Sequence, residues 1–219
     1  MEHLPIFINI KQKPTLVVGG GDIALRKINL LLKAKAKVDC LSPLFCEDIN
    51  TLFKDGYIKL IKKSFEQADI KDYSVIIAAT DDSSVNSLIS SIAHDKRIPV
   101  NVVDSPALSS FIIPSIVDRS PVIIAVSSAG KAPVLARIIR AKLETVIPSS
   151  YGILAEIAGE YRQRVKDRFS QIKDRRAFWE TAFSGVIAEK VFSGRINEAK
   201  NDIEKQLNDS VEMELGEVY

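Results

Sequence analysis

A run of three glycines near the amino terminus constrains the fold of this chain more than any other feature. The sequence Gly19-Gly-Gly-Asp-Ile-Ala24 directly follows Thr15–Val18, an apolar and β-branched run that is typical of a strand. The glycine run leads into the segment Asp22–Lys35, in which apolar residues recur at the spacing of a helix. These observations predict a strand and a helix joined by a turn that has little room for side chains.

The glycine run also matches the G-x-G-x-x-A form of the dinucleotide-binding fingerprint. In that pattern Gly19 permits the tight turn, Gly21 lets the backbone approach a pyrophosphate, and Ala24 lets the helix lie close to the strand. The helix N-terminus supplies N–H donors and positive potential. We therefore expect a bound dinucleotide, with tight packing and no ligand as the alternative.

The first hundred residues alternate between strand and helix patterns. This order predicts an α/β fold with a doubly wound, Rossmann-like parallel sheet, and the glycine motif makes it the expected dinucleotide-binding domain. The remaining expected strands are Val38–Leu41, Ile58–Ile61, Ser74–Thr80 and Val100–Val103, and the remaining expected helices are Glu47–Phe53 and Ser84–His94.

The pattern changes after Asp104. Two strands are expected, Phe111–Val117 and Val122–Val126, and the turn-like residues 118–121 between them favour a hairpin. A helix should begin at Pro133 and end before Pro148, and only helices are expected from Tyr151 onward. The sequence thus predicts three parts: residues 1–113, a small α+β region at 114–148, and an all-α region at 149–219.

Composition excludes several classes of protein. Hydrophobic residues make up 46% of the chain, so it can build a core, and a net charge of +2 gives no reason to expect a nucleic-acid or membrane partner. Two histidines and two cysteines are too few for a His/Cys metal site, so no protein-held metal is expected. With no targeting or membrane segment visible, we expect a cytoplasmic protein with reduced thiols.

The end of the second expected strand bears on the choice of cofactor. Ser42-Pro43 stands where an acid would bind the ribose of NAD, and no Lys or Arg follows that could bind a 2′-phosphate. Glu47 and Asp48 follow instead, which favours NAD over NADP. Thr80, at the end of another strand, should lie beside the cofactor; alternatively the run Thr80-Asp-Asp82 caps the next helix.

Two further segments could carry chemistry. Asp104 follows the fifth expected strand at the edge where ligands bind, so it is a candidate general base, or else a turn residue before Ser105-Pro106. Ser127-Ser-Ala-Gly-Lys131 precedes a helix and offers hydroxyls, N–H groups and an ammonium to an anion, with simple capping as the alternative.

Basic residues are concentrated in the second half of the chain. Between Arg119 and Leu143 there are five bases, among them Lys131 and Arg137, and no acid; from Arg162 to Arg176 there are seven bases and two acids. Such stretches suit a polyanionic small molecule, or they are solvated helix faces.

These residues resemble the N-terminal dehydrogenase/ferrochelatase module of the siroheme synthase family, over essentially the whole chain. The segments that carry the resemblance are His3–Phe7, Val18–Asp22, Arg26-Lys27, Ala78–Asp82, Asn101–Pro106, Phe111–Ser115, Asp118–Pro121, Ala125–Ser128, Pro133–Arg137 and Arg175–Trp179.

The resemblance implies NAD-dependent oxidation of precorrin-2 to sirohydrochlorin, then insertion of ferrous iron as a substrate, in a homodimer. It implies that Asp104 is catalytic, that Asp22, Ile23, Pro43 and Leu44 contact NAD, and that Ser128 is a phosphorylatable serine near the tetrapyrrole. In longer members a methyltransferase follows, and Gly216–Tyr219 resembles its first strand; no methyl-donor site is expected in this chain.

Two other functions stay open on the sequence. A dehydrogenase that lacks chelatase activity would show the same motifs. A non-catalytic NAD-sensing module would need neither Asp104 nor a cleft for a polyanion.

Overall fold

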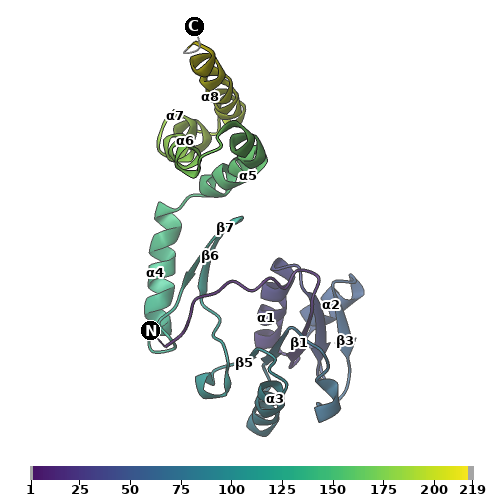
Figure 1. The fold of residues 1–219 in the computed structure, drawn as a ribbon. Coiled ribbons are helices and arrows are strands. Elements are labelled where there is room, and N and C mark those ends of the chain that lie inside the picture. The colour runs from purple at the N-terminus through teal and green to yellow at the C-terminus, as the bar shows by residue number, and fades with distance from the viewer. Residues whose placement is uncertain (1, 217–219) are drawn as a thin grey trace. The chain divides into compact units, whose positions relative to one another are not determined.

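The computed structural model describes residues 2–216, with side chains as far as Asn208. The chain forms two compact units (Figure 1). One runs to Ile113 and includes Ala129–Lys131; the other comprises Pro114–Ser128 and continues from Ala132. A boundary after residue 113 was expected, whereas the further division at 148/149 stays a prediction.

The first unit contains a five-stranded parallel sheet in the order β3-β2-β1-β4-β5. The strand order reverses between β1 and β4, which makes their carboxyl ends the edge where a dinucleotide binds in this fold. The predicted α/β class is therefore confirmed. The strands are β1 (Pro14–Val18), β2 (Lys37–Leu41), β3 (Ile58–Ile61), β4 (Val75–Ala78) and β5 (Val100–Val102).

Helices cover both faces of this sheet because alternate strand residues point to opposite faces. Val17 belongs to the core beneath α1 and α2, whereas its neighbours Leu16 and Val18 belong to the core beneath α3. The helices are α1 (Asp22–Lys33), α2 (Glu47–Lys54) and α3 (Ser83–Asp95), with short 3-10 turns η1 (Gln67–Asp69) and η2 (Pro106–Leu108).

The second unit begins with an antiparallel hairpin of β6 (Ser115–Arg119) and β7 (Val122–Val126). The hairpin was predicted, but its first strand was not placed correctly, because residues 111–114 are not part of it. The Phe111 carbonyl accepts from Asn101 Nδ2 at 3.1 Å, and Phe111 and Ile113 pack on the core of the first unit. Phe111 and Ile113 are therefore apolar because they pack against the core of the parallel sheet, and not because they belong to the hairpin.

Five helices follow, and the last four share one core that includes Leu154, Phe178, Val191 and Ile203. The all-helical character expected from Tyr151 onward is confirmed for the part of the chain that the structure describes. Residues 217–219 of the expected terminal strand lie outside the described range, and Gly216 ends α8. The helices are α4 (Pro133–Val146), α5 (Ser150–Arg168), α6 (Ile172–Ser184), α7 (Val186–Phe192) and α8 (Ile196–Gly216).

Candidate functional site

The glycine loop between β1 and α1 is shaped by two backbone approaches. Gly19 has a φ of +132°, and a Cβ there would stand 2.2 Å from the Ala79 carbonyl oxygen. A Cβ at Gly20 would stand 1.8 Å from the carbonyl oxygen of Leu44. Gly20 occupies a position that the fingerprint leaves unspecified, so the motif alone missed it, although the unbroken glycine triplet was a signal.

Gly21 has the opposite environment. A Cβ at this position would have no atom within 4 Å, so the position faces open space. Gly21 is the N-cap of α1, yet no side chain caps the helix there. Ala24 is fully buried against the sheet, as the fingerprint predicts. The first turn of α1 is therefore available to a phosphate group, which fits a pyrophosphate.

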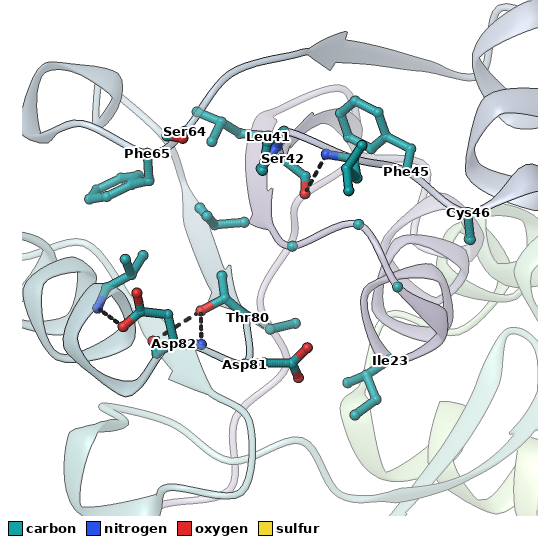
Figure 2. A pocket seen from close by; sticks show the side chains of 18 of the residues that line it. Ile23, Leu41, Ser42, Phe45, Cys46, Ser64, Phe65, Thr80, Asp81 and Asp82 are labelled. Carbon is teal, nitrogen blue, oxygen red and sulfur yellow. Dashed lines mark hydrogen bonds between the residues drawn. The ribbon is translucent and has the colours of Figure 1, made fainter.

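A cavity of about 830 Å³ opens beside this loop (Figure 2). Four chain segments surround it, at the carboxyl edge of β1, β2 and β4. All seven predicted cofactor residues line it, namely Gly19, Gly21, Asp22, Ile23, Pro43, Leu44 and Thr80. Ser64 and Phe65, which follow β3, also line it and carried no sequence signal. The volume suits a ligand of cofactor size.

The charges around this cavity are all negative. Asp22, Asp81 and Asp82 line it, and among the residues that the structure describes no lysine or arginine does. Asp82 caps α3 by accepting from the backbone N–H groups of Ser84 and Val85. Hydrogen bonds from the Ser84 side chain and from these N–H groups hold the pKa of Asp82 below its usual value. Residues 80–82 were expected either to lie beside the cofactor or to cap the next helix. Asp82 performs the capping.

Thr80 has a separate role within the loop. Its hydroxyl donates to Asn86 Oδ1 at 2.8 Å, and its carbonyl accepts from Asn86 Nδ2 at 2.9 Å. These bonds tie the end of β4 to α3 and hold Thr80 at the wall of the cavity.

Asp39, the acidic residue on β2, forms a hydrogen bond away from the first cavity. The Tyr73 hydroxyl donates to Asp39 Oδ2 at 2.9 Å, and Asp39 does not line the cavity. Burial, and then this bond, raise the pKa of Tyr73, which therefore stays protonated as the donor. Asp39 thus does not replace the missing ribose acid.

Asp104 lies next to the first cavity, in a second one of about 480 Å³. It follows β5, is exposed, and has a φ of +56°, which is uncommon for a residue other than glycine. Val103 and one face of α1 form the rest of the wall. Ile23 lines both cavities, so the carboxylate lies beside the dinucleotide-sized cavity and not within it.

Ser128, Lys131 and Arg137 line neither of these two cavities. Ser128 Oγ accepts from the N–H of Ala132, the N-cap residue of α4, at 3.0 Å, but no side chain caps the helix itself, so the capping alternative for this loop is not observed. Lys131 is exposed and forms a salt bridge of 3.3 Å with Glu2. Arg137 is exposed on α4.

Several basic side chains of the two basic stretches form hydrogen bonds or salt bridges within the second unit. Arg119 Nε donates to the Ile147 carbonyl at 2.8 Å, and Arg140 pairs with Glu144. Arg164 pairs with Glu204, and Arg176 pairs with Glu180. The sequence therefore overstated how much of this charge is free to meet a polyanion.

The described residues include neither a metal-binding cluster nor a helix suited to a membrane. Among residues 2–208, whose side chains the structure describes, there is no group of three or more His, Cys, Asp or Glu side chains that could hold a metal ion. Within residues 2–216, no helix has both the length and the apolar character needed to cross a membrane.

The fold and the glycine-lined cavity define an NAD(P)-binding domain of the Rossmann class. In agreement, the family described as "Putative NAD(P)-binding" matches residues 6–115. "Sirohaem biosynthesis protein central" matches residues 119–145, and "Sirohaem synthase dimerisation region" matches residues 150–207. The chain belongs to the siroheme synthase family.

Relatives with that name are similar over the whole chain. A siroheme synthase of Ruthia magnifica subsp. Calyptogena magnifica is 59% identical over 219 residues, and one of Methylobacillus flagellatus is 49% identical over 219 residues. The chain spans about half the length of these relatives, 46% and 47%.

A solved structure, "SirC, precorrin-2 dehydrogenase", has the same fold. Its TM-score is 0.73 at 21% identity, and the match covers 94% of this chain and 100% of that one.

Proposed function

We propose that this chain oxidises precorrin-2 to sirohydrochlorin with NAD as the hydride acceptor, and then inserts ferrous iron to form siroheme. The observation that carries the proposal is the position of Asp104. Its cavity adjoins the glycine-lined cavity through Ile23, so a substrate over Asp104 would lie next to a cofactor. The names of the relatives, siroheme synthase and precorrin-2 dehydrogenase, agree with this chemistry.

The residues that line the first cavity fit NAD. The open position at Gly21 and the uncapped start of α1 suit its pyrophosphate, and Pro43, Leu44 and Thr80 form the facing walls. Bound there, NAD would supply the hydride acceptor. Three aspartates and no cation around the cavity favour NAD over NADP.

Asp104 is the proposed general base. Precorrin-2 loses a hydride and one proton on oxidation, giving sirohydrochlorin, NADH and H⁺. A carboxylate beside the cofactor can accept that proton. Metal insertion displaces two pyrrole N–H protons as Fe²⁺ binds, and the same carboxylate can accept protons there. The macrocycle supplies the nitrogen ligands, so iron needs no His/Cys cluster of the protein.

The proposed assembly is a homodimer. Residues 150–207 match a dimerisation region, and α4 exposes a run of large apolar side chains in the single chain. Val134, Leu135, Ile138 and Val146 are 47–63% exposed. Burial of this surface against a second copy would remove it from water.

Ser128, Lys131 and Arg137 remain proposed contacts or regulatory positions for the tetrapyrrole, and Ser128 is the proposed phosphorylation site. The compartment proposed for this activity is the cytoplasm, where Cys40 and Cys46, both free, would stay reduced.

The test is an anaerobic reaction of the chain with precorrin-2 and NAD⁺, followed by absorbance, with Fe²⁺ added after oxidation. We expect conversion to sirohydrochlorin and then to siroheme. In Asp104→Ala both steps should slow by at least about 100-fold, because the proton acceptor is gone, while NAD affinity changes less than about twofold. Asp72→Ala is the control, since Asp72 is exposed and lines neither cavity.

Each alternative function predicts a different result. No oxidation by the wild-type chain, with NAD still bound, would favour an NAD-sensing module. Oxidation without metal insertion would favour a dehydrogenase that lacks chelatase activity. Metal insertion that survives Asp104→Ala would contradict the shared base.

A further inference from the structure

The second cavity contains three cations that the proposed function does not yet use. Arg26, Lys27 and Lys33 lie on α1, and all three line the cavity of Asp104. With Ile23 and Leu30 they follow the spacing i, i+3, i+4, i+7 and i+10, which forms one stripe along a helix. Buried residues of α1, including Ala24 and Ile28, occupy a different stripe against the sheet. The helix thus offers a cationic face next to its core face.

The charges in this cavity are unbalanced. Three cationic side chains line it and Asp104 is the one carboxylate among the lining residues. Lys27 is half-buried, whereas Arg26, Lys33 and Asp104 are exposed. A cavity with this balance attracts anions, and attraction is stronger where the cation is partly removed from water.

The cations are also not held by other protein groups. Across the described part of the chain, no salt bridge within 4.0 Å involves Arg26, Lys27 or Lys33, and the Arg26 guanidinium makes a weak hydrogen bond of 3.4 Å to the Asp22 carbonyl. Burial lowers the pKa of Lys27, and the Asp104 charge opposes that shift. An anionic ligand would therefore meet cations that form no salt bridge, with Asp104 as the nearby carboxylate that acts on Lys27.

We propose that Arg26, Lys27 and Lys33 form a carboxylate-binding subsite that holds acid side chains of the tetrapyrrole and so places the macrocycle over Asp104. This inference rests on the proposed function. It assigns substrate orientation to α1 of the NAD-binding unit and not to the basic stretches after residue 118, where several bases are used internally.

The geometry explains how one helix can serve both ligands. The first turn of α1 faces the glycine-lined cavity, and its later turns carry the cations that face Asp104. A polycarboxylate held on those later turns lies beside whatever is bound at the first turn. Orientation by fixed charges of this kind can contribute strongly to rate because the reacting atoms are already aligned.

The subsite is tested by titrating the full chain with uroporphyrin, which carries eight carboxylates, and with coproporphyrin, which carries four. The variants are Lys27→Gln and Lys33→Gln, and NAD affinity is measured in parallel. We expect each variant to raise the Kd for uroporphyrin about tenfold, with a smaller effect for coproporphyrin, and to leave the Kd for NAD within about twofold.

Two controls separate charge from folding. Lys71→Gln removes one positive charge from an exposed loop residue that lines neither cavity, and it should not change uroporphyrin binding. Lys33→Arg keeps the charge at an exposed helical position and should retain most of the affinity lost in Lys33→Gln.

The outcomes are distinct. The subsite is overturned if uroporphyrin does not bind, if the Lys27 and Lys33 variants bind it like Lys71→Gln, or if the loss appears in NAD affinity, which would make these cations part of the cofactor site. Charge-dependent binding of uroporphyrin by a chain that does not oxidise precorrin-2 would support the subsite and contradict the proposed function.

Discussion

At the residue scale, Gly20 shows how a contact outside the known fingerprint positions can shape a binding loop. We predict that Gly20→Ala destabilises the protein by about 1–3 kcal/mol and weakens NAD binding, because the new Cβ would overlap the Leu44 carbonyl oxygen, a wall of the cavity. Urea unfolding and an NAD titration measure both effects.

The control is Gly159→Ala. Gly159 lies within α5, and a methyl group at this position would have no neighbouring atom within 4 Å. Alanine there should stabilise the helix by about 0.5–1 kcal/mol. If Gly20→Ala behaves like Gly159→Ala, the loop tolerates a side chain and the steric explanation is wrong.

The three aspartates that line the first cavity lead to a second prediction at the residue scale, which concerns the preference for NAD over NADP. The 2′-phosphate of NADP would enter a cavity that has three carboxylates and no cation among its lining residues. We expect the Kd for NADP to exceed that for NAD by at least about tenfold, because like charges repel. Isothermal titration with both cofactors measures the ratio, and equal affinities would contradict this role of the carboxylates.

At the element scale, the start of α3 depends on the Asp82 cap. The pKa of Asp82 is lowered in the folded protein, so its contribution to stability is present above its unfolded value of 3.8 and is lost as pH falls through the folded value. In Asp82→Asn the amide oxygen can still cap the helix but does not titrate. We therefore expect this variant to show a flatter dependence of Tm on pH below about 4. Parallel slopes for the two proteins would show that Asp82 is not responsible.

At the scale of the whole molecule, the exposed face of α4 predicts association between two copies. Ile138→Asp should shift a dimer toward monomer in sedimentation equilibrium, because it places a charge in a surface proposed to be buried. Leu88→Asp is the matched control, since Leu88 on α3 is 45% exposed and Ile138 is 47% exposed. A dimer unaffected by Ile138→Asp would show that α4 lies outside the interface.

From the amino-acid sequence alone, the strand–glycine–helix unit, the α/β order and seven of the residues that line the first cavity could be predicted. These features are local: a tight turn needs Gly19, and apolar spacing of 2 or 3.6 residues defines strands and helices. The hairpin and the helices after Pro133 were predictable for the same reason. The start of β6 was not, because Phe111 and Ile113 are apolar for contacts made with a distant sheet.

Which charged groups lie close together depends on the tertiary structure. Crossover connections bring the end of β5 beside α1, so Asp104 shares a cavity with Lys27, 77 positions earlier in the chain. Long-range contacts likewise engage Asp39 with Tyr73 and Arg164 with Glu204. Spacing along a chain fixes which face of an element a residue occupies, but the partner across that face depends on how the elements pack.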